Sequence, residues 1–154
     1  MSADNSKESA AAWMLALDDQ HRAVVGEREL IHLVERPTLL EVPLSPYYCR
    51  QAMLWNDLLL PALDLAAWLH GQVGNGHQKL TGIVAYQSGQ NVSYGALLLA
   101  DIPERVQISD SQACPLPEYP SNWDQLAISC FRQGEKPIPI LDLPYLFGGG
   151  LLLH

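Results

Sequence analysis

Two aspartates stand in a repeated motif, and a pair of related carboxylates could perform acid–base chemistry. The motif P-x-L-D-L occurs at Pro61–Leu65 and again at Pro139–Leu143. Two carboxylates that share a proton would serve a hydrolase of the aspartic-protease type. Each aspartate, however, lies between leucines where a helical turn would begin, and aspartate is a preferred helix N-cap. The motif therefore favours capping, and a hydrolase that uses Asp64 and Asp142 is the alternative.

The three cysteines, Cys49, Cys114 and Cys130, offer a second kind of chemistry. Their odd number and the absence of a C-x-x-C pair argue against a secreted disulfide framework, so we expect reduced thiols in the core. Cys49 follows two tyrosines and is the candidate nucleophile of a second hydrolase hypothesis. Arg50 is the only sequence neighbour that would lower the pKa of this thiol.

The five histidines do not form an H-x-x-x-H pair, and we find no aspartate, glutamate or cysteine at ligand spacing beside one, so the sequence predicts no metal site. Glycine motifs that bind phosphate or dinucleotides are also missing, as is the G-x-S-x-G motif of serine hydrolases. We therefore expect no cofactor.

Short apolar runs separated by polar turns make up most of the chain, which is typical of an all-β fold with a few short helices. Asn56-Asp57 separates two such runs and predicts a hairpin turn. The segment 27–35 has apolar residues at 30, 31, 33 and 34 and favours a brief helix that ends before Pro37. Residues 1–11 are expected to form a loose N-terminus and residues 148–154 a tail. The repeated motif predicts two similar half-structures.

Composition narrows the classes of partner. The chain has 154 residues, of which 48% are hydrophobic, enough to bury a sizeable core. Its 17 acidic and 9 basic residues give a net charge of -8, which argues against nucleic acid and anionic membrane surfaces as partners. No apolar run is long enough to insert into a membrane, and the first ten residues do not resemble a secretory signal, so we expect a cytoplasmic protein.

Four segments resemble the CheW-like family, and they occur in the family's order: 34–46, 51–65, 94–106 and 139–143. The resemblance extends over most of residues 12–147, which it implies form one domain. It implies a fold of two interleaved five-stranded SH3-like β-barrels. It also implies a non-catalytic adaptor that couples a chemoreceptor to the regulatory domain of a CheA-type histidine kinase.

The chain departs from the family where Gly-x-x-x-Leu-Arg-Gly is usual: Gln51 stands at the first glycine, and Trp55, Asn56 and Asp57 stand at Leu-Arg-Gly. The family's arginine is associated with receptor signalling, and an amide beside a carboxylate cannot replace its guanidinium group. We expect partner contacts on the strand around 38–42 and on the hairpin around 51–58. The predicted contact residues are Leu40, Val42, Met53, Trp55, Asn56 and Asp57. A structural assembly protein of the same fold is a further alternative, and it would bury an apolar patch between identical subunits.

Overall fold

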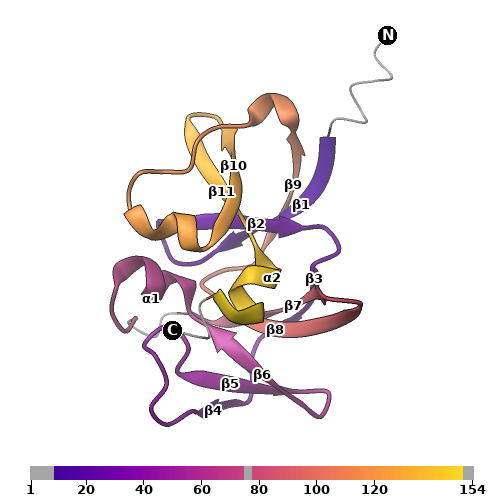
Figure 1. Cartoon of the computed structure of the whole chain (residues 1–154), viewed down its shortest axis with the longest axis vertical. Helices are drawn as coiled ribbons and strands as arrows, with labels where there is room; N and C mark the ends of the chain where they lie inside the picture. Colours follow the sequence, from indigo (N-terminus) through magenta and orange to yellow (C-terminus); the bar gives the residue numbers. More distant parts are fainter. Residues whose placement is uncertain (1–8, 75–77, 151–154) are drawn as a thin grey trace.

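Strands from both ends of the chain share one sheet. The computed structural model describes residues 9–74 and 78–150. The first sheet has five strands in the order β10-β11-β2-β1-β9 (Figure 1). Their bounds are β1 Ser9–Ala16, β2 Arg22–Gly26, β9 Glu104–Ser109, β10 Ala127–Gln133 and β11 Lys136–Leu141. An antiparallel bridge between Ala113 and Phe131 joins the chain after β9 to β10, so the sheet closes into a barrel.

The middle of the chain forms the second sheet, which has six strands in the order β3-β7-β8-β6-β5-β4. Their bounds are β3 Leu30–Val34, β4 Leu39–Glu41, β5 Gln51–Trp55, β6 Leu58–Leu63, β7 Leu80–Ser88 and β8 Asn91–Leu99. The sheets interleave because β3 to β8 are inserted between β2 and β9 (Figure 1). We call the two units the first and second barrel. This architecture confirms the predicted all-β class, with six strands rather than five in the second sheet.

The helical elements are short. The α-helices are α1 Leu65–His70 and α2 Leu143–Tyr145, and both follow the repeated motif. Two 3-10 turns, η2 Asp110–Gln112 and η3 Ser121–Gln125, lie between β9 and β10. A π-helical turn, η4 Leu146–Gly150, continues directly from α2, so Gly148 lies in a helical turn rather than in a tail. The rest of the predicted tail, 151–154, lies outside the described residues.

Strand pairing corrects two predictions from the sequence, one about the type of an element and one about a boundary. The segment expected to be a helix contains β3, which pairs antiparallel with β7. Its apolar spacing fits both structures, and the hydrogen bonds available along β7 decide between them. β1 begins at Ser9, which is opposite Ser109 of β9, so residues 9–11 are part of the sheet. Residues 1–8 lie outside the described chain.

Three apolar clusters hold the fold together. Met14 and Val24 lie in the cluster of the first barrel, and Met53 and Ile83 in that of the second. The third and largest cluster draws side chains from both sheets, among them Leu15, Val25, Leu63, Leu97 and Leu143. Successive strand residues point to opposite faces, so Met14 faces its own barrel while Leu15 faces the seam between the barrels.

The repeat is visible in the strand pairing. Ala62 of β6 pairs in parallel with Ala96 of β8, and Ile140 of β11 pairs in parallel with Val24 of β2. In each copy the motif's proline stands one residue before this parallel pairing begins. Its missing N–H therefore costs the parallel ladder nothing, as expected for proline within a strand.

Candidate protein-interaction surface

Three leucines lie exposed on one face of three neighbouring strands. Leu54 of β5 is directly opposite Leu59 of β6, and Leu40 of β4 is directly opposite Ala52 of β5. Opposite residues share a face of the sheet, and so do residues two apart along one strand. The exposed fractions of Leu40, Leu54 and Leu59 are 47%, 49% and 60%. Ala52, which is buried, and Pro61, which is half-buried, point to the same face, and we call the surface that the three leucines form there the β4–β6 face.

The residue that follows β4 extends this surface. Val42 follows β4, its N–H donates to the Arg50 carbonyl at 2.9 Å, and its side chain is exposed. Arg50 is exposed and supplies a polar group at the border of the face. Glu41 and Gln51, whose side chains hydrogen-bond at 3.3 Å, point to the other face of the sheet, as Met53 does. The face thus combines apolar side chains with polar groups at its border. Exposed large apolar side chains with polar groups around them are typical of protein–protein contact sites.

Met53 does not belong to this surface. Only 2% of the residue is exposed, and it packs inside the second barrel with Leu60 and Ile83. The prediction of Met53 as a contact residue is therefore wrong. Strand alternation puts Met53 inside and its neighbour Leu54 outside, but the unbroken apolar run of β5 did not reveal which residues point outward.

The predicted hairpin turn is present, and its two central residues are exposed. Asn56 and Asp57 both have positive φ, 48° and 62°, as a type I′ turn requires. Trp55 is half-buried, and its ring centroid lies 5.7 Å from that of Tyr94 and 6.4 Å from that of His32. Trp55 therefore packs on the inner face at the end of the second barrel, whereas Asn56 and Asp57 remain available to a partner.

The two motif aspartates cap their own helices. A carboxylate oxygen of Asp64 accepts from the Ala67 N–H at 3.0 Å and from the Gln78 amide at 2.9 Å. The corresponding oxygen of Asp142 accepts from the Tyr145 N–H at 3.2 Å. In the described part of the chain, no hydrogen bond joins the two carboxylates. The geometry supports N-capping and gives no support to a shared-proton hydrolase.

The cysteines also lack the features of a nucleophile. Cys49 is buried, and burial raises the pKa of its thiol. The sulfur atoms of Cys114 and Cys130 lie 3.4 Å apart, and burial together with Cys114 raises the pKa of Cys130 to about 12. A reactive cysteine needs the opposite shift, toward the thiolate, so the structure does not favour the Cys49 hydrolase hypothesis.

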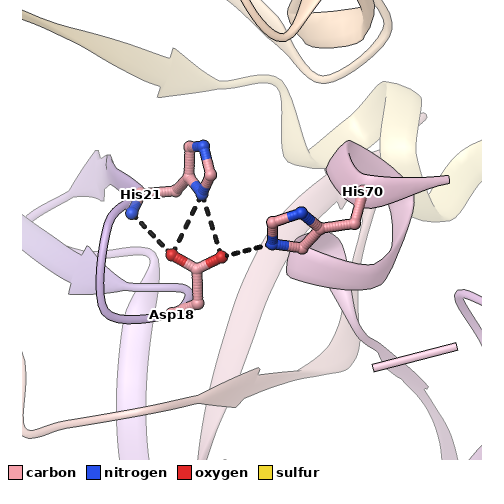
Figure 2. Close-up of side chains that lie close together, drawn as sticks. All are labelled: Asp18, His21 and His70. Carbon is pink, nitrogen blue, oxygen red and sulfur yellow. Dashed lines mark hydrogen bonds and ion pairs between the residues drawn. The ribbon is translucent and has the colours of Figure 1, made fainter. Parts of the chain in front are cut away.

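A further cluster, which sequence analysis missed, joins Asp18 to His21 and His70 (Figure 2). The prediction of no metal site rested on the lack of an H-x-x-x-H pair and of an acidic residue or cysteine at ligand spacing beside a histidine. It overlooked Asp18 beside His21, and the two histidines come from different elements. Asp18 stands three residues before His21, and this short spacing was the available signal. His70 is 52 residues from Asp18 and meets it only through the fold.

The sequence and the fold of this chain are similar to those of known proteins. A family model described as a CheW-like domain matches residues 13–149. The chain belongs to the CheW-like family. Its fold is also similar to the crystal structure of the scaffolding protein TtCheW from Thermoanaerobacter tengcongensis, with a TM-score of 0.71 and 16% sequence identity over 90% of this chain and 92% of that one. A comparison with curated proteins gave no significant match.

The structural comparison agrees with the overall fold of this CheW-like chain. Among the helices of residues 9–74 and 78–150, none combines the length and the hydropathy needed to cross a bilayer.

Proposed function

We propose that this CheW-like protein is a non-catalytic, cytoplasmic adaptor in a chemotaxis-like signal-transduction system. It couples a receptor to a CheA-type histidine kinase through protein–protein contacts. The β4–β6 face is the observation that carries the proposal, because it presents exposed leucines on a rigid sheet. The groups that could perform hydrolysis have structural roles instead: Asp64 and Asp142 cap helices, and Cys49 is buried.

The regulatory domain of the kinase is the partner we assign to the β4–β6 face. An apolar sheet surface suits a folded domain with a complementary apolar patch. Burying a leucine completely is worth roughly 1.5–3 kcal/mol, and the three leucines here are already about half-buried. Each would therefore add roughly 1 kcal/mol on docking. The Arg50 guanidinium at the border of the face would set the orientation of the partner more than the affinity.

Receptor coupling in this chain must differ from the usual family mode. Asn56 stands at the family's arginine position, and Asp57 brings a negative charge into the same exposed turn. Neither side chain can donate a bidentate fork of hydrogen bonds to a carboxylate. We infer that a receptor docking at this turn presents basic or polar groups, and that the kinase contact does not depend on the turn.

Calorimetric titration with the regulatory domain of a CheA-type kinase from the same genome tests the proposal. The double variant Leu54→Ser/Leu59→Ser removes the centre of the β4–β6 face. Ile128→Ser is the matched control, because Ile128 is 67% exposed on β10 of the other barrel. Losing about 2 kcal/mol should weaken binding roughly 30-fold in the double variant, whereas the control stays within about twofold. Absence of binding by the wild type, or equal binding by the double variant, would contradict the proposal.

The same exposed face also makes self-assembly the second candidate. A structural assembly protein would bury Leu54 and Leu59 against a second copy of the chain. Sedimentation velocity distinguishes the two functions. An adaptor sediments as a monomer without the kinase, whereas an assembly protein forms oligomers that Leu54→Ser/Leu59→Ser disperses.

A further inference from the structure

Two imidazole rings converge on one carboxylate at the edge of the seam (Figure 2). The Nδ1 atom of His21 lies 2.9 Å from Oδ2 of Asp18, and the Nε2 atom of His70 lies 2.8 Å from the same oxygen. The three ligand atoms all lie within 4.8 Å of one another. Asp18 is also fixed through Oδ1, which accepts from the backbone N–H groups of Gln20 and His21 at 2.7 and 2.6 Å.

The cluster links the two barrels. Asp18 and His21 lie in the turn between β1 and β2 of the first barrel. His70 is the last residue of α1, which follows β6 of the second barrel. Asp18 and His70 line a cleft of about 410 Å³, so the cluster has an open side that can admit an ion and its remaining ligands. The side chains of Asp18 and His21 are 23% and 17% exposed, whereas His70 is 46% exposed and has room to adjust.

We propose that Asp18, His21 and His70 form a binding site for a divalent transition-metal ion, with Zn²⁺ as the ion best suited to them. Two imidazole nitrogens and one carboxylate oxygen are typical ligands of zinc and its neighbours, whereas Ca²⁺ and Mg²⁺ prefer all-oxygen sites. Three protein ligands leave a fourth position for water or for a group from a partner.

Zinc binding requires both imidazoles to shift, because the ligand atoms lie within 4.8 Å of one another but not at tetrahedral spacing. Bonds of about 2.0–2.1 Å in a tetrahedral site place ligand atoms roughly 3.3 Å apart. The two nitrogen–oxygen distances are 2.9 and 2.8 Å, so the imidazoles must each withdraw by about 0.5 Å. The ring proton that each histidine now directs at Asp18 moves to its other ring nitrogen, or leaves to solvent if the ring is charged. The freed lone pairs then bind the ion.

The surroundings also favour a cation. Asp64 lies close enough to act electrostatically on Asp18, and Asp19 also lines the cleft. Arg22 directs its guanidinium at the Asp18 backbone carbonyl, at 3.1 Å, and not at the carboxylate. The carboxylate is thus left to the two imidazoles and to backbone N–H groups, and the chain carries a net charge of -8.

Zinc titration of the untagged full-length chain tests this site, by calorimetry and by thermal unfolding with and without ZnCl₂. Wild type should bind one Zn²⁺ per chain and melt at a higher temperature, with no such response to Mg²⁺ or Ca²⁺. His70→Ala and Asp18→Asn should bind zinc at least about 10-fold more weakly. His32→Ala is the matched control, because His32 is an exposed histidine on β3, and it should bind zinc within about twofold of wild type.

Cobalt gives a readout that reports the ligands directly. The wild-type Co²⁺ complex should show the visible absorption of a four-coordinate site, and zinc should abolish it by displacement. His70→Ala should lack this absorption while melting within a few degrees of metal-free wild type, because His70 is half-exposed. Absence of zinc binding by wild type would overturn the proposal, since the cluster would then be a hydrogen-bonded triad only. Equal zinc binding by wild type and His70→Ala would overturn it as well, by placing the ion elsewhere.

Discussion

Replacement of Gly95 by alanine tests how the C-terminal segment packs on the seam. Gly95 lies in β8 opposite Val84, and a Cβ atom built on it would overlap ring atoms of Phe147 in η4. The Phe147 residue is 6% exposed, and its ring stacks on Tyr86 with centroids 5.4 Å apart. The backbone at Gly95 does not have positive φ, so steric overlap alone decides the effect of the new methyl group.

The expected cost is about 2–3 kcal/mol. Overpacking a well-filled core costs roughly 1–3 kcal/mol, and driving a phenylalanine out of its site forfeits roughly 1.5–3 kcal/mol of burial. The molecule will adopt the cheaper response, so the two costs do not add. The sign of the change in the free energy of unfolding is informative, because Gly→Ala in a strand without overlap would stabilise the chain by roughly 0.5–1 kcal/mol.

Urea unfolding of a double-mutant cycle with Phe147→Ala provides the assay. Phe147→Ala alone should cost about 3–5 kcal/mol, and it should cost at least ~1 kcal/mol less in the Gly95→Ala background, where the ring is already displaced. Gly148→Ala is the matched control, because a Cβ atom there meets nothing within 4 Å. A neutral or stabilising Gly95→Ala, or strict additivity with Phe147→Ala, would refute this packing.

Two further predictions concern half-buried carboxylates, and urea unfolding measures both. Asp64→Ala should lose the α1 cap and destabilise the chain by about 1–2 kcal/mol, whereas Asp64→Asn keeps an acceptor for the Ala67 N–H and should cost less than ~0.5 kcal/mol; equal losses would mean that the charge, not the cap, matters. Burial raises the pKa of Glu29, outweighing the Gly26 N–H bond that lowers it, so the charged form opposes folding at pH 7. Glu29→Gln should therefore be more stable than wild type at pH 7, and the gain should shrink as the pH falls through the folded pKa toward the unfolded value of 4.5; a gain that persists at pH 4 would contradict this.

Features set by neighbouring residues could be predicted from the sequence. The Asn56-Asp57 turn and the Asp64 and Asp142 caps each depend on a few consecutive residues, whose side chains have strong positional preferences. The repeat could also be predicted, because the motif P-x-L-D-L occurs in both halves of the sequence. These local signals predicted the all-β class and the repeat, whereas the interleaved barrels were expected from the resemblance to the CheW-like family.

Features that depend on distant residues could not be predicted. The pattern of β3 fits helix and strand equally, and only the presence of β7 beside it selects the strand. The outward direction of Leu54 and the inward direction of Met53 depend on which face of β5 the second barrel covers. The Asp18 cluster needs α1 to lie against the β1–β2 turn, a contact between segments 52 residues apart.

Amide hydrogen exchange of this protein, with and without the kinase regulatory domain, tests the adaptor proposal most directly. The account predicts slower exchange in the edge strand β4 and in the flanking backbone of residues 42–44 when the kinase domain is bound. It also predicts unchanged exchange in β10 and β11, on the other barrel. No change anywhere, or protection confined to β10 and β11, would contradict the claim that the β4–β6 face binds the kinase.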